Sequence, residues 1–217
     1  SRLRERVGMP SVAIGEFDAW GAGARALLAR ADGEAPAKCL MVSIGTGTSV
    51  LLADGDETRR VGGSALGGGT LLGLGRLLTG ANGFGELAEL AARGERLRVD
   101  LVLSDIYQPG EIALPEWATV ASFGRLAFAS ADGVSREDLA AGVVHLVAED
   151  VALLCGGLAL AMQVRDVAIG GSTVPGNPAL VETFVRLVGA FGCRTHVLED
   201  GEYAGALGVL ERLRAAG

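Results

Sequence analysis

The chain has 217 residues, enough for one sizeable core or two small lobes, and 49% of them are hydrophobic against 21% charged. This composition excludes an intrinsically disordered chain. The net charge of −7 argues against a general nucleic-acid binder, because attraction to phosphates requires a basic surface. We therefore predict a globular protein that does not bind nucleic acid.

Cysteine usage and apolar runs bear on the compartment. The three cysteines and two histidines are widely spaced, so neither a disulfide framework nor a metal site built on them is expected. The longest uncharged apolar run, Val151 to Met162, is too short to span a bilayer. The first residues lead into no long apolar segment of the kind that a signal peptide requires. We predict a cytoplasmic protein with free thiols and no membrane association.

The first half of the chain predicts a helix, a hairpin and two further helices. Residues Glu16–Arg30 have an apolar face and an acidic start, as an amphipathic helix does. Two apolar runs joined by a glycine turn over residues 38–53 predict a hairpin, and Glu57–Val61 predicts a third strand. A loop with five glycines in eight residues (62–69) then precedes helices over 70–78 and 84–93.

The second half alternates helices and strands. Residues 99–123 contain prolines and predict irregular structure. Ser135 and Asp138 form a capping pattern for a long helix that runs to Gln163, with an interruption or kink at Gly156-Gly157. A strand over 166–169, a helix over 178–191, a strand over 195–198 and a helix over 202–215 follow. The alternation predicts an α/β fold.

Two glycine-rich turns are candidate phosphate-binding sites. In the Gly45–Ser49 turn (GTGTS), glycines let backbone N–H groups face a phosphate and threonines add donors; an ordinary hairpin turn is the alternative. The run Gly67–Thr70 leads directly into a predicted helix, whose N-terminus favours an anion; a flexible loop with a Thr cap is the alternative. The occurrence of both turns within 25 residues favours phosphate binding.

A glycine turn late in the chain resembles the Gly45–Ser49 turn, and two charged residues, Glu16 and Arg60, are candidates for catalysis and substrate binding. Residues 42–48 (VSIGTGT) resemble 167–173 (VAIGGST), which would suit two lobes that grip one nucleotide. Glu16, at a helix start, is either a general base or a solvated acid stabilised by the helix dipole. Arg60, before the glycine loop, either orients an anionic substrate or lies on the surface. We interpret both histidines and Cys155 as structural.

An ordered set of short motifs along nearly the whole chain resembles the type II pantothenate kinases, a family with the acetate kinase, sugar kinase, Hsp70 and actin fold. Each motif is weak alone, and the order makes the set specific. The motifs are EFDA at 16–19, IGTGTS at 44–49, RRVGG at 59–63, GGGT at 67–70, GLG at 73–75, LL at 77–78, DIY at 105–107, ASFG at 121–124, IGG at 169–171 and GEYAGALG at 201–208.

The resemblance implies roles for individual residues. Glu16 matches the carboxylate that takes the proton from the pantothenate hydroxyl, and Arg60 matches the arginine that holds pantothenate and supports the reacting phosphate. Ala121 lies in the segment that lines the pantothenate pocket. The residues that match nucleotide-binding positions are Gly45, Thr46 and Gly47 of the second phosphate loop, Gly68, Gly69, Thr70, Leu71 and Leu72, the aromatic Phe84, and Gly170 and Gly171 of the adenosine-side turn.

The same resemblance implies an actin-like (ribonuclease H-like) ATPase fold of two lobes. Residues 1 to about 60 would be the remainder of an N-terminal lobe, and residues 61–217 a C-terminal lobe with a dimerisation helix that starts at Arg136. The family's first phosphate loop, of the pattern D-x-G-G-T-x-x-K, does not occur in this sequence. We therefore expect an incomplete N-terminal lobe.

The implied activity is the ATP-dependent phosphorylation of pantothenate, the first step of coenzyme A biosynthesis, by a cytoplasmic homodimer. Mg²⁺ would sit mainly on phosphates and water, so no dedicated ligand cluster is expected. CoA or an acyl-CoA is a candidate inhibitor. Two alternatives stay open: a kinase of the same fold for another small molecule, such as an N-acetyl sugar, and a pseudokinase or CoA-sensing module. A Rossmann dehydrogenase is excluded, because no G-x-G-x-x-G follows an early strand.

Overall fold

A five-stranded mixed sheet organises the molecule, with strand order β3-β2-β1-β6-β7. The computed structural model describes residues 12–55, 57–111, 115–128 and 131–215. The first three strands form an antiparallel meander, and β6 and β7 run parallel to β1. The strands are β1 (Lys38–Ile44), β2 (Thr48–Asp54), β3 (Glu57–Ser64), β6 (Asp166–Gly170) and β7 (Arg194–Val197).

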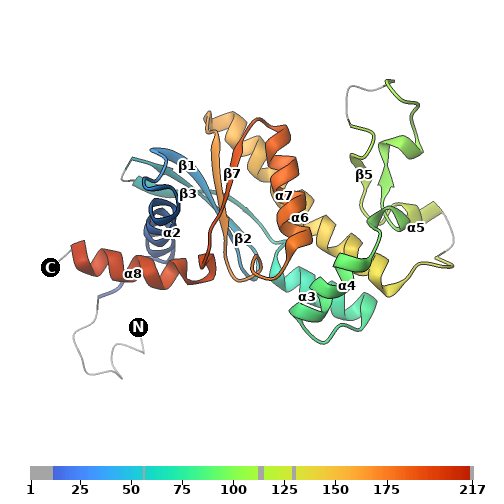
Figure 1. Ribbon diagram of the computed structural model, residues 1–217, viewed down its shortest axis with the longest axis horizontal. Coiled ribbons are helices and arrows are strands. Elements are labelled where there is room, and N and C mark those ends of the chain that lie inside the picture. The colour runs from blue at the N-terminus through green and yellow to red at the C-terminus, as the bar shows by residue number, and fades with distance from the viewer. Residues whose placement is uncertain (1–11, 56, 112–114, 129–130, 216–217) are drawn as a thin grey trace.

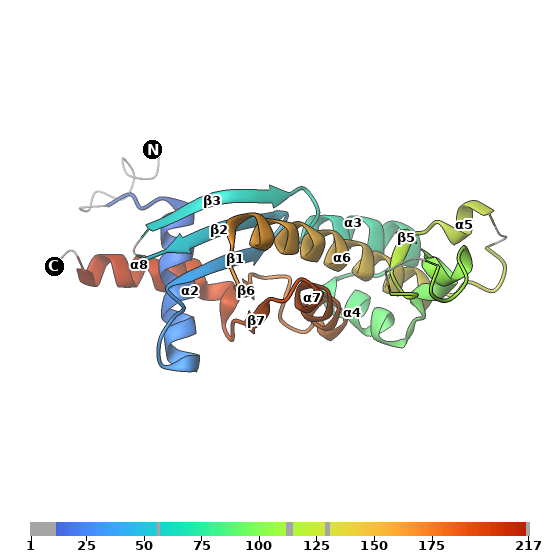
Figure 2. The same ribbon diagram turned by 90° about the horizontal axis from the view of Figure 1, so that it is seen from above.

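Helices cover both faces of the sheet, as Figures 1 and 2 show from two sides. One face is covered by α2 (Glu16–Asp32) and α8 (Ala204–Ala215), and the other by α6 (Arg136–Met162) and α7 (Pro178–Ala190). Near the ends of β1 and β3 lie α3 (Gly68–Thr79) and α4 (Phe84–Arg93). A short extension contains β4 (Leu101–Val102), β5 (Thr119–Ala121), α5 (Arg125–Phe128) and the 3₁₀ helices η1 (Arg96–Arg98) and η2 (Leu103–Asp105); η3 (Gly201–Tyr203) precedes α8.

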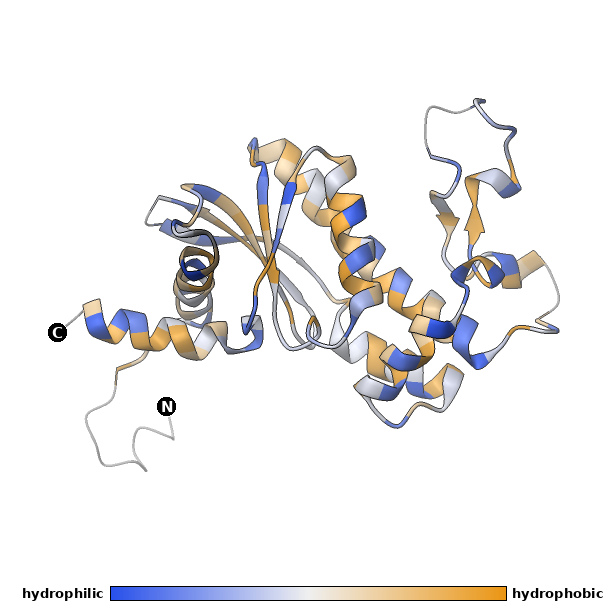
Figure 3. Cartoon of the chain, in the orientation of Figure 1, coloured by the Kyte–Doolittle hydropathy of each residue, from blue (hydrophilic) through white to orange (hydrophobic). Residues whose placement is uncertain are grey.

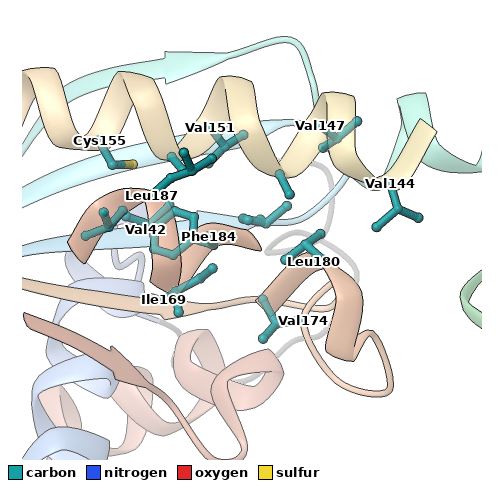
Figure 4. Close-up of a cluster of buried hydrophobic side chains, with 14 of the residues drawn as sticks. Val42, Val144, Val147, Val151, Cys155, Ile169, Val174, Leu180, Phe184 and Leu187 are labelled. Carbon is teal, nitrogen blue, oxygen red and sulfur yellow. The ribbon is translucent and has the colours of Figure 1, made fainter. Parts of the chain in front are cut away.

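The alternation of side chains along the strands explains the two layers. In β1, Leu40, Val42 and Ile44 point into the core beneath α6 and α7, whereas Cys39 and Met41 point toward α2. Because successive side chains of a strand face opposite sides, an uninterrupted apolar strand needs cover on both. The larger core, between the sheet, α6 and α7, is drawn in Figure 4.

The long helix α6 is the central element of this larger core. An 18-residue window of α6 has a mean hydropathy of 1.8, which by length and composition alone would suffice to cross a membrane, but 61% of it is buried inside the fold. Figure 3, in which the ribbon is coloured by hydropathy, shows many hydrophobic residues along α6. Ser135 accepts a hydrogen bond from the Asp138 N–H (3.1 Å) and Asp138 accepts one from the Ser135 N–H (3.0 Å), which confirms the predicted cap.

Most predicted elements are confirmed, and three predictions are wrong in informative ways. Gly62 and Gly63 belong to β3, where they pair with Val50 and Ser49 of β2. The helix after the glycine loop begins at Gly68 and not at Thr70. α6 continues without interruption through Gly156, because the missing side chain makes room for the Phe191 ring.

The sequence predicts an N-terminal lobe that ends at about residue 60 and a C-terminal lobe over residues 61–217. Residue 60 lies within β3, and β1 and β2 share one sheet with β6 and β7. The division into two lobes at this point stays a prediction. Residues 1–11 lie outside the described part of the chain.

Two glycines bring α2 and α8 into backbone contact. A Cβ on Gly208 would overlap the carbonyl of Ala19, and a Cβ on Gly23 would overlap the carbonyl of Ala204. Both obstacles are backbone atoms and cannot rotate away, so only glycine permits this helix crossing. The contact matters for function because it fixes α2, whose first residue is Glu16.

We expect Gly208→Ala to destabilise the protein by about 1–3 kcal/mol, the usual cost of overpacking. Gly205→Ala is the matched control on the same helix, since no atom lies within 4 Å of its added Cβ. The control should be neutral or slightly stabilising, because Ala favours helix over Gly. Urea unfolding midpoints measure both variants, and equal stability of the two would refute the close-contact argument.

A buried carboxylate joins β6 to β7 at the opposite end from the glycine turns. Asp166, whose side chain is 12% exposed, accepts hydrogen bonds from His196 Nε2 (2.9 Å) and Arg194 Nη2 (3.1 Å). Burial alone would raise the pKa of Asp166, but the hydrogen bonds and the positive charge of Arg194 outweigh it and hold the pKa below its ordinary value.

The lowered pKa of Asp166 predicts a pH-dependent contribution to stability. The contribution is fully present above the unfolded-state pKa of about 4 and is lost as the pH falls through the lower folded-state pKa. Asp166→Asn should therefore be less stable than the natural chain at pH 7, and the difference should shrink below about pH 4. Urea unfolding at a series of pH values tests this, with Glu199→Gln, a change of an exposed carboxylate, as the control. A constant difference at all pH values would contradict it.

Candidate active site

Three glycine-containing segments meet where β1 and β6 end. The parallel pairing of Leu40 with Val167 and of Ser43 with Gly170 brings both strands to one edge of the sheet at the same level. The loop Gly45–Gly47 follows β1, the turn Gly170–Thr173 follows β6, and the start of α3 lies against both. Ligands of α/β sheets bind beyond such carboxyl ends of strands.

This arrangement corrects the interpretation of the repeated turn. The two similar segments, 42–48 and 167–173, do not come from two lobes that face each other. They lie on neighbouring strands of one sheet and contact each other directly, because the Thr173 N–H donates to the Ile44 carbonyl (3.1 Å).

Glycine is required where these segments touch. A Cβ on Gly67 would collide with the backbone of Gly47, and one on Gly68 would collide with the Thr173 hydroxyl. Gly171 has φ +103°, a region that side chains disfavour, and its Cβ would collide with the backbone of Ile44. The clustering of glycines in the sequence therefore reflects three backbone segments packed without side chains between them.

All three carbonyl groups of the Gly45–Gly47 loop have donors within the protein. The Gly45 carbonyl accepts from the Gly68 N–H (2.7 Å) and the Thr173 hydroxyl (3.1 Å). The Thr46 carbonyl accepts from the Gly69 N–H (2.9 Å), and the Gly47 carbonyl from the Gly45 N–H (2.9 Å). No carbonyl of the loop is left to repel an approaching anion.

Two N–H groups of the same loop, unlike its carbonyls, have no partner among the described residues. Within the part of the chain that the structure describes, the N–H groups of Thr46 and Gly47 donate to no protein acceptor. In a planar trans peptide the N–H points opposite to the preceding carbonyl. Carbonyls held against α3 and Thr173 therefore direct these two N–H groups away from the protein, as a phosphate-binding loop requires.

The sequence predicts that the N-terminus of the helix after Gly67–Thr70 binds an anion, but the N–H groups at the start of α3 have other partners. Its Gly68 and Gly69 N–H groups are already used by the carbonyls of Gly45 and Thr46, so they hold the loop and are not free donors for an anion. The Thr70 hydroxyl donates to the Ala65 carbonyl (3.3 Å) and does not cap the helix.

The other predicted nucleotide contacts differ in exposure. Leu71 is fully buried in the core, whereas Leu72 is exposed. Phe84, at the start of α4, is half-buried and packs against the same core. Gly170 is buried and lies beside Gly201 at the start of η3. The binding roles of these residues stay predictions, and Leu71 can serve only through its backbone.

Glu16 and Arg60 come from neighbouring elements, the start of α2 and the edge strand β3. Both side chains are exposed. The Arg60 guanidinium lies 5.8 Å from the centre of the Phe17 ring, next in sequence to Glu16. The same guanidinium extends along β3 toward Gly63, since a Cβ on Gly63 would collide with its Nη2. Arg60 thus connects the Glu16 end of α2 with the end of β3 that contacts the Gly47 loop.

Ala121 is far from the rest of the predicted site within one chain. It lies on β5, in the extension at one end of the long axis, whereas α2 lies toward the other end in both views (Figures 1 and 2). The fold does not bring Ala121 together with Glu16 and Arg60 within one chain.

A buried acid supports the Ala121 segment. Asp100 is fully buried and accepts a hydrogen bond from the Phe123 N–H (2.9 Å), and Phe123 has a left-handed backbone with φ +56°. Burial raises the pKa of Asp100, although the hydrogen bond and nearby Arg96 oppose the shift. Arg96 also donates to the Trp117 carbonyl (2.9 Å) and so fixes the incoming strand.

Sequence reasoning did not single out Gly63, Thr173 or Asp100. Thr173 had a signal, since it ends the segment that resembles 42–48. Gly63 also had a signal, since it ends the RRVGG motif, but its contact with the Arg60 side chain could not be read from the motif. Asp100 had none, because its bond from the Phe123 N–H forms only when the chain folds.

A hollow of about 600 Å³ lies elsewhere, between α2 and α8. Alanines and the charged Arg25, Glu211 and Arg212 line it, and it contains none of the predicted site residues. The predicted site is instead an open surface of loops and strand ends.

The chain is similar to known kinases in sequence. The sequence model of the family described as Fumble matches residues 26–212. A protein from Staphylococcus aureus named type II pantothenate kinase is 32% identical over 209 residues, which is 96% of this chain and 78% of that protein. A protein of the same name from Oceanobacillus iheyensis is 32% identical over 171 residues, 79% of this chain and 63% of that protein.

The fold is similar to that of a ROK family glucokinase from Streptomyces griseus, solved in complex with glucose and AMPPNP. The TM-score is 0.59 at 15% identity, over 99% of this chain and 71% of that one. Together with the strand order and the glycine loops, this similarity defines an actin-like ATPase fold. Within that class, the sequence similarity shows that the chain belongs to the type II pantothenate kinase (Fumble) family. The chain spans less than two thirds of the Oceanobacillus relative's length.

We expect Gly63→Ala to displace the Arg60 guanidinium from its place along β3, because the added methyl group occupies the same space. The kinase reaction proposed below should then be slowed about tenfold or more. The methyl group would also collide with the Thr48 carbonyl. A lower rate caused by the displacement of Arg60 must therefore be distinguished from a lower rate caused by reduced stability. Gly189→Ala, with no atom within 4 Å of its added Cβ, is the control.

A double-mutant cycle provides the separation. In an Arg60→Ala background, Gly63→Ala should slow the reaction little further, because its effect acts through Arg60. Additive losses in the rate of product formation would contradict this assignment.

Proposed function

We propose that the protein transfers the terminal phosphoryl group of ATP to the primary hydroxyl of pantothenate and forms 4′-phosphopantothenate, the first step of coenzyme A biosynthesis. The observation that carries the proposal is the Gly45–Gly47 loop: its carbonyls accept hydrogen bonds from within the protein, and among the described residues its Thr46 and Gly47 N–H groups have no acceptor. Membership of the type II pantothenate kinase family supports pantothenate as the acceptor.

The residues of the chain supply positioning and charge stabilisation, which is what phosphoryl transfer requires. The Thr46 and Gly47 N–H groups donate to phosphate oxygens, and the Thr46 hydroxyl offers a further donor. Glu16 accepts the proton of the pantothenate hydroxyl as the oxygen attacks phosphorus. Arg60 pairs with the substrate or with the charge that develops on the transferred phosphoryl group.

Mg²⁺ would reach the site on the ATP phosphates, since this ion keeps several waters and binds substrate phosphates in kinases. It would neutralise charge between the phosphates. We make no assignment of Mg²⁺ to a residue of this chain.

The oligomeric state, the compartment and regulation are part of the same proposal. We propose a cytoplasmic homodimer in which α6, with its exposed Leu153 and Leu160, faces the second copy. CoA or an acyl-CoA would compete for the site as an inhibitor. The separation of Ala121 from Glu16 in one chain is compatible with either a second copy or a conformational change that completes the acceptor pocket.

The test is product formation with the full-length protein, ATP and Mg²⁺, with pantothenate, an N-acetyl sugar and glucose as separate acceptors and detection of products by mass. Pantothenate should be phosphorylated and the sugars should not. Glu16→Ala should slow the reaction by about 10²–10⁴-fold, the usual contribution of a general base.

Glu202→Ala is the matched control, because Glu202 is also an exposed glutamate in the first turn of a helical segment. It should leave the rate unchanged. Phosphorylation of a sugar in preference to pantothenate would refute the proposed acceptor. Binding of CoA without turnover of any acceptor would favour a sensor in place of a kinase.

A further inference from the structure

Thr173 is almost completely buried, with 3% of its surface exposed, at the point where the three loop segments meet. Its N–H donates to the Ile44 carbonyl (3.1 Å) and its hydroxyl donates to the Gly45 carbonyl (3.1 Å). The hydroxyl also lies against the Cα of Gly68, where a Cβ would collide with it. One side chain therefore contacts the turn after β1 and the start of α3 from the turn after β6.

The Gly45 carbonyl and the Thr46 N–H belong to one peptide unit. The planar trans peptide fixes these two groups in opposite directions, so any donor that orients the Gly45 carbonyl also orients the Thr46 N–H. The carbonyl has two acceptor positions, and the Gly68 N–H (2.7 Å) and the Thr173 hydroxyl (3.1 Å) fill both.

The neighbouring peptides of the loop are held by bonds from the Gly69 N–H to the Thr46 carbonyl and from the Gly45 N–H to the Gly47 carbonyl, but among the described residues nothing packs where a side chain of Gly45 would lie. No atom lies within 4 Å of a Cβ placed on Gly45, and glycine has the backbone freedom that a peptide flip requires. A flip would turn the Gly45 carbonyl toward the phosphate and the Thr46 N–H away from it, which would exchange an attraction for a repulsion.

We propose that Thr173 is a positioning residue for the ATP phosphates: its buried hydroxyl holds the Gly45 carbonyl inward and so directs the Thr46 N–H at a phosphate oxygen. Thr173 also couples the adenosine-side turn to the phosphate loop, since it is the residue through which the two are hydrogen-bonded. The inference rests on the proposed function only in taking ATP as the ligand.

The test compares Thr173→Val, which removes the hydroxyl and keeps the shape, with Thr173→Ser, which keeps the hydroxyl. Thr195→Val is the matched control: within the described part of the chain, the buried Thr195 hydroxyl has no hydrogen-bond partner, so the same chemical change costs no bond. Dissociation constants of ATP and of adenosine are measured by calorimetry or competition on the full-length proteins, with thermal unfolding alongside.

Thr173→Val should weaken ATP binding about tenfold, the size of one hydrogen bond to a charged group, and should leave adenosine binding unchanged. Thr173→Ser and Thr195→Val should bind ATP as the natural protein does. In turnover, the KM for ATP should rise in Thr173→Val while the KM for the acceptor stays constant, a split that general loss of stability would not produce.

The proposal is overturned if Thr173→Val binds ATP normally, if adenosine binding falls as much as ATP binding, or if Thr173→Ser is as weak as Thr173→Val. If Thr173→Val does not fold, the comparison of Thr173→Ser with the natural protein still tests the proposal, because a Ser variant that binds ATP weakly contradicts the role of the hydroxyl. These results leave the proposed reaction standing. If the natural protein binds ATP but phosphorylates no acceptor, the proposed kinase activity is refuted. The effect of Thr173→Val on ATP binding then still decides the role of Thr173. Absence of ATP binding by the natural protein overturns both.

Discussion

The parallel pairing of β1 with β6 is the constraint on which the candidate site depends. The register that places Ser43 beside Gly170 brings two glycine turns, separated by about half of the chain, to the same level at one edge of the sheet. Once they are side by side, their polar backbone groups must find partners, because buried carbonyls and N–H groups are costly to leave unpaired. The bonds that result run from Gly68, Gly69 and Thr173 to the carbonyls of the Gly45–Gly47 loop. They leave the Thr46 and Gly47 N–H groups without an acceptor among the residues that the structure describes. The hydrogen bonds that satisfy this backbone are therefore the same ones that fix the orientation of the loop for the proposed phosphate binding.

Glycine has two distinct roles in this protein. Around the loop it removes side chains from between backbones, as at Gly67 and Gly171, and leaves the N–H groups accessible. In α2 and α8 it lets two helices cross in backbone contact at Gly23 and Gly208. The second role still serves the site, because α2 presents Glu16 and Phe17 to Arg60 of the edge strand. Glycine usually costs stability, because its backbone has more freedom in the unfolded chain. In this protein it allows the backbones of neighbouring elements to approach closely, so the contacts between elements are short and specific.

The charged groups separate into structural and functional sets. Asp166 and Asp100 are buried, accept hydrogen bonds from neighbouring strands or turns, and hold those segments together. Glu16 and Arg60 are exposed and make few contacts with the rest of the chain. An exposed carboxylate and guanidinium near an open surface are available to a substrate, whereas a buried, fully bonded carboxylate is not.

The sequence by itself determined the α/β class, the strands of the main sheet with the helices that cover it, the cap of α6 and the family, because periodicity, caps and ordered motifs are local signals. It did not predict α5, nor β4 and β5, since residues 99–123 were expected to be irregular. It also led to the prediction that the Gly45–Gly47 turn binds phosphate, which stays a prediction. It could not show that Gly68 and Gly69 support this loop, that Gly62 and Gly63 are strand residues, or that the two similar turns are neighbours in one sheet. Nor could it reveal the contact of Arg60 with Gly63 or the bond from Thr173 to Gly45. The Arg60 contact depends on the conformation of a side chain along β3, and the other features depend on pairing between residues distant in the chain. Only the tertiary structure, which fixes where each backbone donor finds its acceptor, decided them.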